Sequence, residues 1–317
     1  LVDPSRPPVA GLAVEQIHFA AHAELAALRL GRALARTGSL DQPLDGACRD
    51  VARWVEFHHA GQAQSLAAWR SLAALDLVDQ VLRNYNVDTI LHFAAHIKVP
   101  ESVADPIKYY RNNTCATRSL LETCARAGVG QIVFSSTAAV YGIPEGAYAD
   151  ETTPTAPINP YGTSKLMSEW MLRDLAASSV LRYVSLRYFN VAGSDPKGRI
   201  GQSTRKATLL VKVACESAVG KRPHVSIFGT DYATPDGTGV RDYIHVEDLA
   251  AAHLSAIDYL DRGGASTTLN CGYGHGYSVR EVVKMVEHIN GGRSLPVVES
   301  PRRAGDPPSL VAHAERI

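Results

Sequence analysis

The chain has 317 residues, of which 45% are hydrophobic and 20% charged, so it can bury one large core or two moderate ones. Its 32 basic residues balance its 32 acidic residues, and the sequence pI is about 7.3. This balance gives no sign of a nucleic-acid partner or of an anionic membrane surface as partner.

The cysteines and the apolar runs indicate the compartment. There are five cysteines, an odd number, and no two form a C-x-x-C pair. We therefore expect buried, reduced thiols and neither a disulfide framework nor a metal site. No apolar run is long enough to span a bilayer, and the first residues do not resemble a signal peptide. The sequence predicts a cytoplasmic protein.

Residues 1–74 differ from the rest of the chain, because they are rich in Ala, Leu and Arg and carry few strand signals. No two of their glycines have the spacing of a dinucleotide-binding turn. The first βαβ unit of a dinucleotide-binding fold is therefore not recognisable. We interpret the stretch first as misread or frameshifted, second as a real replacement, and third as a divergent segment that still folds as strands.

From about residue 75, strand-like apolar runs alternate with helical patterns. Strands are predicted at 89–95, 131–137, 182–191 and 266–272. Helices are predicted at 112–128 and 161–177. The second helix places five large apolar side chains on one face: Leu166, Met167, Trp170, Met171 and Leu175. This alternation predicts the α/β class, with a Rossmann-type doubly wound parallel sheet covered on both faces. From about residue 193, frequent Gly, Pro and Asp predict a smaller α/β lobe.

Polar residues close three of the predicted strands, at His96, Thr137 and Asn190. Ligands of parallel sheets bind beyond the carboxyl ends of the strands, so these positions are candidates for a site. Tyr161 and Lys165 lie four residues apart at a helix start, and such residues point from one face.

Tyr161, Lys165 and Thr137 suit proton transfer between an alcohol and a ketone. A free tyrosine has a pKa of about 10, and moving it to about 7 requires roughly 4 kcal/mol of preference for the phenolate. A neighbouring ammonium favours the ionised form, and the Thr137 hydroxyl can bond the reacting oxygen. Because Y-x-x-x-K also occurs by chance, a solvated Tyr and Lys on a helix surface is the alternative interpretation.

Longer motifs decide between these interpretations. Five segments resemble the signature segments of UDP-glucose 4-epimerases, members of the extended short-chain dehydrogenase/reductase family, and the similarity runs from about Leu75 to about Ala312. The segments are FSSTAAVYG (134–142), NPYGTSK (159–165), RYFNVAG (187–193), GTDYATPDGTGVRDYIHVEDLA (229–250) and PRRAGDPP (301–308).

The resemblance implies NAD as cofactor, a UDP-sugar as substrate, and a homodimer. It implies Tyr161 as the catalytic base, Thr137 as the group that orients the sugar 4-oxygen, and Lys165 as the residue that holds the ribose and lowers the tyrosine pKa. The remaining cofactor contacts that it implies are Phe93, Ala94, Ala95, Asn112, Ser135, Tyr188 and Phe189. The substrate contacts are Thr137, Asn190, Arg241, Tyr243, Arg303 and Asp306, whose two arginines suit a pyrophosphate.

The resemblance also implies a division of the chain. Residues 1–192 form the NAD-binding domain, with 1–74 aberrant, and 193–317 form mainly the substrate lobe, which ends before the closing helical segment expected of the family.

The sequence bears on three alternatives to a glucose-specific epimerase. Ala138 and Ala139 follow Thr137 where the family's dehydratases carry acids, which argues against elimination. The resemblance places Leu310 where the family has a residue that gates the sugar pocket, and a leucine there leaves a UDP-N-acetylhexosamine 4-epimerase open. Leu209 replaces an expected polar contact, and the absent glycine-rich loop leaves an inactive nucleotide-sugar binder open.

Overall fold

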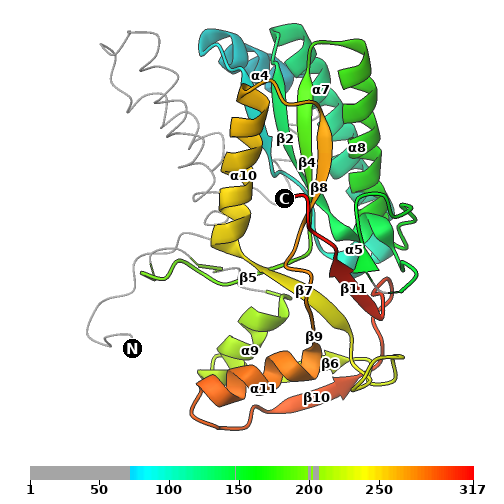
Figure 1. Ribbon diagram of the computed structural model, residues 1–317, viewed down its shortest axis with the longest axis vertical. Coiled ribbons are helices and arrows are strands. Elements are labelled where there is room, and N and C mark those ends of the chain that lie inside the picture. The colour runs from blue at the N-terminus through cyan, green and yellow to red at the C-terminus, as the bar shows by residue number, and fades with distance from the viewer. Residues whose placement is uncertain (1–71, 147, 199–200, 203–206) are drawn as a thin grey trace. The chain divides into compact units, whose positions relative to one another are not determined.

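A computed structural model describes residues 72–146, 148–198, 201–202 and 207–317 (Figure 1). The chain divides into two compact units, Leu66–Gly193 with Thr208–Ile317 and Leu1–Ser65 with Ser194–Ala207. Every element below lies in the first of these units. The interpretations of residues 1–74 lie, apart from 72–74, outside the described residues.

The larger unit is built on a parallel sheet. Its strands are β1 (Thr89–His92), β2 (Gln131–Thr137), β4 (Arg182–Tyr188) and β8 (Thr267–Cys271), in the order β1-β2-β4-β8. All three pairings are parallel. Each strand coincides with a run predicted from the sequence, so the predicted α/β class and parallel sheet are confirmed. Because β8 belongs to the later stretch of the chain, residues 193–317 contribute to this sheet as well as to the smaller lobe.

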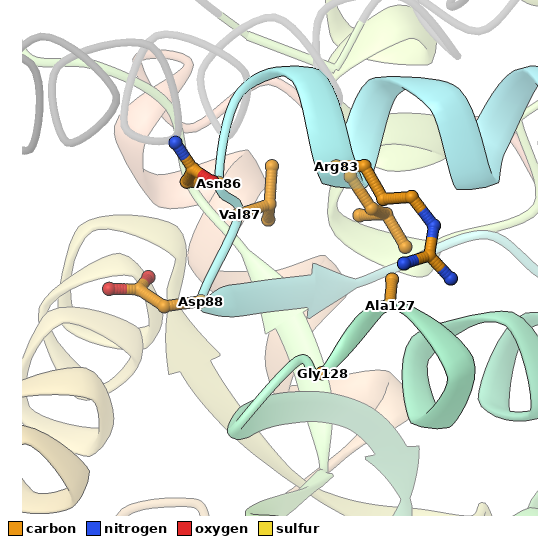
Figure 2. A pocket seen from close by; sticks show the side chains of 7 residues that line it. Arg83, Asn86, Val87, Asp88, Ala127 and Gly128 are labelled. Atoms are coloured by element: carbon orange, nitrogen blue, oxygen red, sulfur yellow. The ribbon is translucent and has the colours of Figure 1, made fainter.

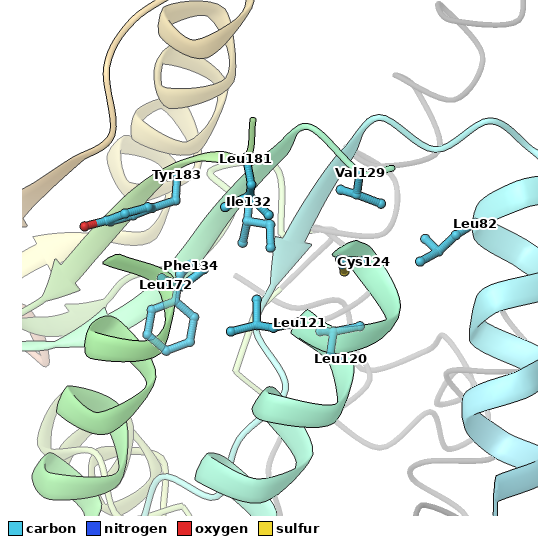
Figure 3. Packing of buried hydrophobic residues seen from close by; sticks show 10 residues of the cluster. All are labelled: Leu82, Leu120, Leu121, Cys124, Val129, Ile132, Phe134, Leu172, Leu181 and Tyr183. Atoms are coloured by element: carbon cyan, nitrogen blue, oxygen red, sulfur yellow. The ribbon is translucent and has the colours of Figure 1, made fainter. Parts of the chain in front are cut away.

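Helices cover both faces of this sheet (Figure 1). Along β2, Ile132 and Phe134 belong to one buried apolar cluster and Val133 to another, as expected for side chains that alternate between faces. Figure 3 shows the first cluster, in which side chains of three helices meet those of the sheet. The helices on that side are α4 (Leu72–Asn84), α7 (Ala116–Ala127) and α8 (Pro160–Ser178). The second cluster packs against α10 (Val246–Asp261).

The predicted helix 112–128 differs from expectation at its start. Short helices α5 (Val99–Ala104) and α6 (Pro106–Tyr109) lead into a π-helix, η1 (Tyr110–Cys115), and only then does α7 begin. A π-helix is rare and inserts an extra residue per turn, often at a functional site. The end of α7 is as predicted, since Gly128 adopts the left-handed conformation with φ 77° that stops a helix.

The same unit contains a second sheet, whose strands alternate along the chain with those of the first. It has the order β3 (Tyr148–Ala149), β11 (Ser309–Ala312), β7 (Val240–His245) and β5 (Asn190–Ala192), and β9 (Gly276–Ser278) pairs antiparallel with β7. The smaller lobe pairs β6 (Val225–Phe228) with β10 (Val297–Ser300) and adds α9 (Leu210–Ala218) and α11 (Val279–Ile289). The remaining element is η2 (Ala138–Tyr141), a 3-10 helix after β2. The smaller lobe has its own buried cluster around Val225 and Val283.

Two expectations about burial are only partly met. Trp170 is 46% exposed, although the pattern places it on the apolar face of the helix, whereas Leu166 on that face is buried. Cys124 and Cys271 are buried as expected, but Cys115 and Cys215 are exposed. In the part of the chain that the structure describes, no helix is long and apolar enough to cross a membrane.

Candidate active site

The predicted site residues gather at the carboxyl ends of three parallel strands. Phe93, Ala94 and Ala95 follow β1, Thr137 is the last residue of β2, and Tyr188 is the last residue of β4. Because the strands are parallel, these ends meet at one edge of the sheet, where ligands of such folds bind.

Helix α8 brings Tyr161 and Lys165 to this edge. Its N-cap Asn159 accepts a hydrogen bond from the Gly162 backbone N–H at 2.8 Å, and Pro160 occupies the first helical position, where its missing N–H costs nothing. Gly162 has to be small, since a Cβ there would lie 2.5 Å from the carbonyl oxygen of Ala139. The bare helix start can therefore approach the turn that follows Thr137.

Tyr161 and Thr137 are hydrogen-bonded to each other, and this bond lowers the phenol's pKa. The Thr137 hydroxyl oxygen also accepts from the Ala139 backbone N–H at 3.2 Å, which leaves its own O–H able to donate to the tyrosine. The Lys165 ammonium donates to the carbonyl oxygen of Ser135 at 2.7 Å and lies 4.9 Å from the centre of the Phe134 ring. The structure thus brings together all three predicted catalytic side chains and Ser135.

Burial sets the electrostatics of this group. Desolvation raises the pKa of Tyr161 above its usual value, and the bond with Thr137 offsets part of that rise. Desolvation lowers the pKa of Lys165 to about 7, against the attraction of the Glu169 carboxylate, which favours the ammonium. The expected lowering of the Tyr161 pKa by Lys165 stays a prediction for the complex.

The other predicted cofactor residues lie around this group. The Tyr188 hydroxyl is 2.5 Å from His253 Nε2, and His253 Nδ1 is 2.7 Å from the Leu249 carbonyl oxygen. The carbonyl can only accept, so Nδ1 carries the proton and Tyr188 donates to Nε2. Phe93 packs against the same imidazole, with ring centres 4.9 Å apart. Phe189 is buried.

Two residues that the sequence analysis did not single out join η1 to the catalytic helix. The Asn113 side chain, from the π-helix, bonds both the backbone N–H and the carbonyl of His96, at 2.8 and 3.0 Å. Its amide also donates to the Ser164 hydroxyl at 3.0 Å, and that hydroxyl donates to the Tyr161 carbonyl. Asn112, which was predicted, donates to Asn113 at 3.0 Å. The adjacent polar pair inside a helical pattern was the available signal.

The predicted substrate residues form a second group on β5 and β7. Asn190 is paired in register with Tyr243. Arg241 donates to three backbone carbonyl oxygens, those of Val240, Pro307 and Pro308, at 2.8, 2.7 and 3.4 Å. Burial lowers the pKa of Arg241, while the nearby Asp306 and Tyr243 act to raise it.

Arg303 and Asp306 complete this second group. Arg303 Nε donates to Asp306 Oδ2 at 2.9 Å, and its guanidinium lies 4.7 Å from the centre of the Phe228 ring. The loop that carries both residues is tied to the catalytic helix, because the Asn159 amide donates to the Gly305 carbonyl oxygen at 3.2 Å. One residue thus caps the helix of Tyr161 and holds the loop of the second arginine.

Leu310 and Leu209 take structural positions. Leu310 is buried in a cluster with Leu166 and Phe189, and it faces Arg241 across the β11–β7 pairing. Leu209 precedes the first residue of α9 and caps it without a side-chain hydrogen bond. Neither position distinguishes one sugar from another, so the sugar preference stays a prediction.

A surface pocket of about 410 Å³ lies away from these residues, at the amino end of β1 (Figure 2). It is lined by the end of α4, the turn after it and the end of α7: Leu82, Arg83, Asn86, Val87, Asp88, Ala127 and Gly128. Because ligands of parallel sheets bind at the opposite ends of the strands, we do not assign the reaction to this pocket.

Comparisons with known proteins identify the family. Residues 46–272, more than half of the chain, match the NAD dependent epimerase/dehydratase family. A UDP-glucose 4-epimerase of Azospirillum brasilense is 58% identical over 246 residues, which cover 78% of this chain and 70% of that protein.

Solved structures agree. The UDP-glucose 4-epimerase of Bifidobacterium longum in complex with NAD+ and UDP is similar with a TM-score of 0.73 and 43% identity, over 76% of this chain and 72% of that one. The UDP-Glc/GlcNAc 4-epimerase of Campylobacter jejuni gives a TM-score of 0.64 and 49% identity, over 78% and 74% of the two chains. The chain therefore belongs to the NAD dependent epimerase/dehydratase family, and within it to the UDP-glucose 4-epimerases of the extended short-chain dehydrogenase/reductase type.

Proposed function

We propose that this chain interconverts UDP-glucose and UDP-galactose by NAD-dependent epimerisation at C4, through a transient 4-keto sugar. The observation that carries the proposal is the joint placement of Thr137, Tyr161 and Lys165 at the carboxyl end of β2, with Thr137 and Tyr161 hydrogen-bonded and Lys165 buried. A strand-end hydroxyl, a phenol and an ammonium are the groups that alcohol–ketone interconversion requires.

The chain's own residues divide the work as follows. Tyr161 removes the proton from the sugar 4-hydroxyl and returns it once the sugar has presented its other face. Thr137, already bonded to Tyr161, holds the 4-oxygen beside the phenol. Arg241 and Arg303 grip the pyrophosphate, so that the nucleotide stays fixed while the sugar turns. Asn190 and Tyr243, which are paired in register on β5 and β7, are the further contacts that we assign to the nucleotide sugar.

The residues at the strand ends fit the nicotinamide-ribose end of NAD. When bound there, NAD would supply the hydride acceptor and donor that the oxidation and reduction at C4 require. An ammonium has three donors, and within the described residues Lys165 Nζ makes one hydrogen bond, to Ser135. Its two other donors suit the two ribose hydroxyls, and Tyr188 and Phe93, at the carboxyl ends of β4 and β1, would contact the nicotinamide end. The glycine-rich turn that binds the pyrophosphate of NAD in this family would fall in residues 1–74, where the sequence has no such turn.

We further propose a homodimer in the cytoplasm. Exposed apolar side chains on α6 and α8 support the dimer, since Ile107 is 61% exposed and Trp170 46% exposed. The odd cysteine number without a C-x-x-C pair supports a reducing compartment. Light scattering of the purified chain tests the homodimer, and a monomer at micromolar concentration would refute it.

Turnover of UDP-galactose by the full chain, with and without added NAD, tests the function. Tyr161→Phe is expected to lower kcat at least about 100-fold, because it removes the acid–base group. Calorimetry should still detect UDP binding to this variant. Tyr277→Phe, at a 45% exposed tyrosine, is the matched control and should leave turnover unchanged. If the unmodified chain binds UDP but has no activity with NAD in excess, the proposed reaction is wrong and the chain is a nucleotide-sugar binder.

A further inference from the structure

Three residues of α8, spaced four apart along the helix, contact the final three residues of β2. Tyr161 bonds Thr137, Lys165 Nζ donates to the Ser135 carbonyl at 2.7 Å, and the Glu169 carboxylate accepts from the Ser136 hydroxyl. Residues four apart on a helix share a face, so this is one continuous stripe against one strand end. The proposed reaction uses the first two members and gives no role to the third.

Glu169 is an unusual residue to bury. It is 6% exposed, and charged side chains are almost never buried to this degree unless they are paired. Its partner is Arg187 of β4, which donates from Nε at 3.1 Å and from Nη2 at 2.7 Å in a two-pronged contact. A buried pair of this kind adds little net stability compared with apolar side chains, so its presence calls for another reason.

Arg187 is itself fixed from the far side. Its Nη1 donates to the Tyr141 hydroxyl at 2.8 Å, and its guanidinium lies 4.8 Å from the centre of the Tyr141 ring. The Tyr141 hydroxyl donates to the Asn270 amide oxygen at 2.7 Å, and the Asn270 amide nitrogen donates to the Ala149 carbonyl oxygen at 2.8 Å. The carboxylate of Glu169 is therefore held in one orientation by groups from β2, β4 and, through them, η2 and β8.

We propose that Glu169 is a positioning residue of the reaction, whose fixed carboxylate, one helical turn beyond Lys165, keeps Lys165 protonated and in register with the end of β2. The proposal deepens the proposed function, because a neutral Lys165 could neither attract a phenolate nor donate to Ser135 and to two ribose hydroxyls at once. Without an anion nearby, desolvation alone favours the uncharged amine. The attraction of Glu169 is the opposing influence on the pKa of Lys165.

Other ionisable groups also face Lys165 or its partners. On α8 these are Tyr161 and Glu169, on β4 Arg187, on β1 His92, whose pKa burial lowers to about 3, and on α6 Tyr109, edge-on to Tyr161. His92 is therefore neutral near pH 7, and the two tyrosines keep raised pKa values through burial. Among the residues that the structure describes, Glu169 is thus the negative charge that acts on Lys165 at neutral pH, and Arg187 forms its ion pair.

The test follows the Lys165 side chain directly, by NMR of the full chain with 13C-labelled lysine, the signal being assigned by its loss in Lys165→Met. In Glu169→Gln, the titration midpoint of Lys165 should fall by about one pH unit or more, as expected when an opposite charge is removed nearby. Ser136→Ala is the matched control, because it removes a hydrogen bond to the same carboxylate but leaves the charge. Its midpoint should stay within about 0.3 units of the unmodified chain.

Kinetics give a second readout. In Glu169→Gln, the alkaline limb of kcat should move to lower pH while KM for the UDP-sugar is unchanged, because Glu169 does not reach the nucleotide sites. A residue that only supports the fold would lower kcat equally at all pH values. If the chain proves inactive, the proposed function fails but the NMR titration still decides the role of Glu169.

An unmoved Lys165 midpoint in folded Glu169→Gln, or an equal shift in Ser136→Ala, would overturn the proposal. If Glu169→Gln does not fold, because Arg187 is left buried without its anion, the double variant Glu169→Gln/Arg187→Met strands no charge. Its Lys165 midpoint should also lie below that of the unmodified chain, although by less than in the single variant, since a repelling cation has gone as well. A midpoint equal to or above that of the unmodified chain contradicts the proposal.

Discussion

Replacing Lys165 by Met should make the fold more stable while it destroys activity. The side chain is 2% exposed, and burial lowers its pKa to about 7 from the usual 10.5. The unfolded chain therefore binds the lysine proton more tightly than the folded chain does, and stability rises with pH between these two values. At pH 7, the cost of keeping the ammonium buried is about 4 kcal/mol, which a neutral methionine of similar length does not carry.

This gain has a pH dependence that distinguishes it from better packing. At pH 9 the folded lysine is already neutral, so the cost in the unmodified chain falls to about 2 kcal/mol. The loss of the bond to Ser135 and of the contact with the Phe134 ring removes about 1–2 kcal/mol from the gain at either pH. We expect a net increase in the free energy of unfolding of about 2–3 kcal/mol at pH 7 that largely vanishes at pH 9.

Urea unfolding followed by circular dichroism at the two pH values measures the effect. Lys221→Met, at an exposed lysine, is the control and should change stability by less than about 0.5 kcal/mol. A Lys165→Met variant that is less stable than the unmodified chain at pH 7 would refute the reasoning. So would a gain of the same size at both pH values, because then the proton is not its source.

Three more substitutions test the surroundings of the site. Asn159→Ala removes the cap of α8 and the bond to Gly305. It should lower the free energy of unfolding by about 1–2 kcal/mol and raise KM for the UDP-sugar. Asn159→Asp, which keeps the cap, is the control. Gly162→Ala sets a Cβ 2.5 Å from the Ala139 carbonyl oxygen, and we expect a loss of about 1–3 kcal/mol together with lower kcat; unchanged urea midpoint and turnover would contradict it. Burial and Lys165 lower the pKa of His92 to about 3, whereas the same side chain in the unfolded chain has a pKa of about 6.5. Between these pH values the unfolded chain binds a proton that the folded chain does not bind. The free energy of unfolding therefore falls by up to about 1.4 kcal/mol for each pH unit of acidification. His92→Gln should therefore lose less stability than the unmodified chain between pH 7 and pH 5 in the same urea assay.

The sequence predicted the regular part of the fold because that part depends on local patterns. Continuous apolar runs fixed the four strands of the parallel sheet, and β2 has the predicted bounds. Gly128 marked the end of α7, since a left-handed residue there is a local requirement. The π-helix before α7 was not predicted, because the 3.6-residue pattern carries no signal for one extra residue.

Residues that pair over a distance were harder to foresee. Glu169 is charged and would be expected on the surface by its type, and its burial depends on Arg187 arriving from another strand. Trp170, one residue further, is 46% exposed, although tryptophan is highly buried on average. The candidate site could be predicted because its motifs are long, but the links through Asn113 and Asn159 depend on tertiary contacts that no local spacing reveals.

The three carbonyl oxygens that hold Arg241 have a consequence for how a nucleotide is handled. A long side chain that becomes immobilised on binding loses roughly 0.5–1.5 kcal/mol of rotational freedom. Arg241 is already oriented by Val240, Pro307 and Pro308, so this entropy is lost once, during folding, and not in each encounter with substrate. The proposed reaction needs one end of the substrate to stay still while the other turns over. An arginine that main-chain carbonyl oxygens already hold in place suits the nucleotide end, which stays bound while the 4-keto sugar rotates.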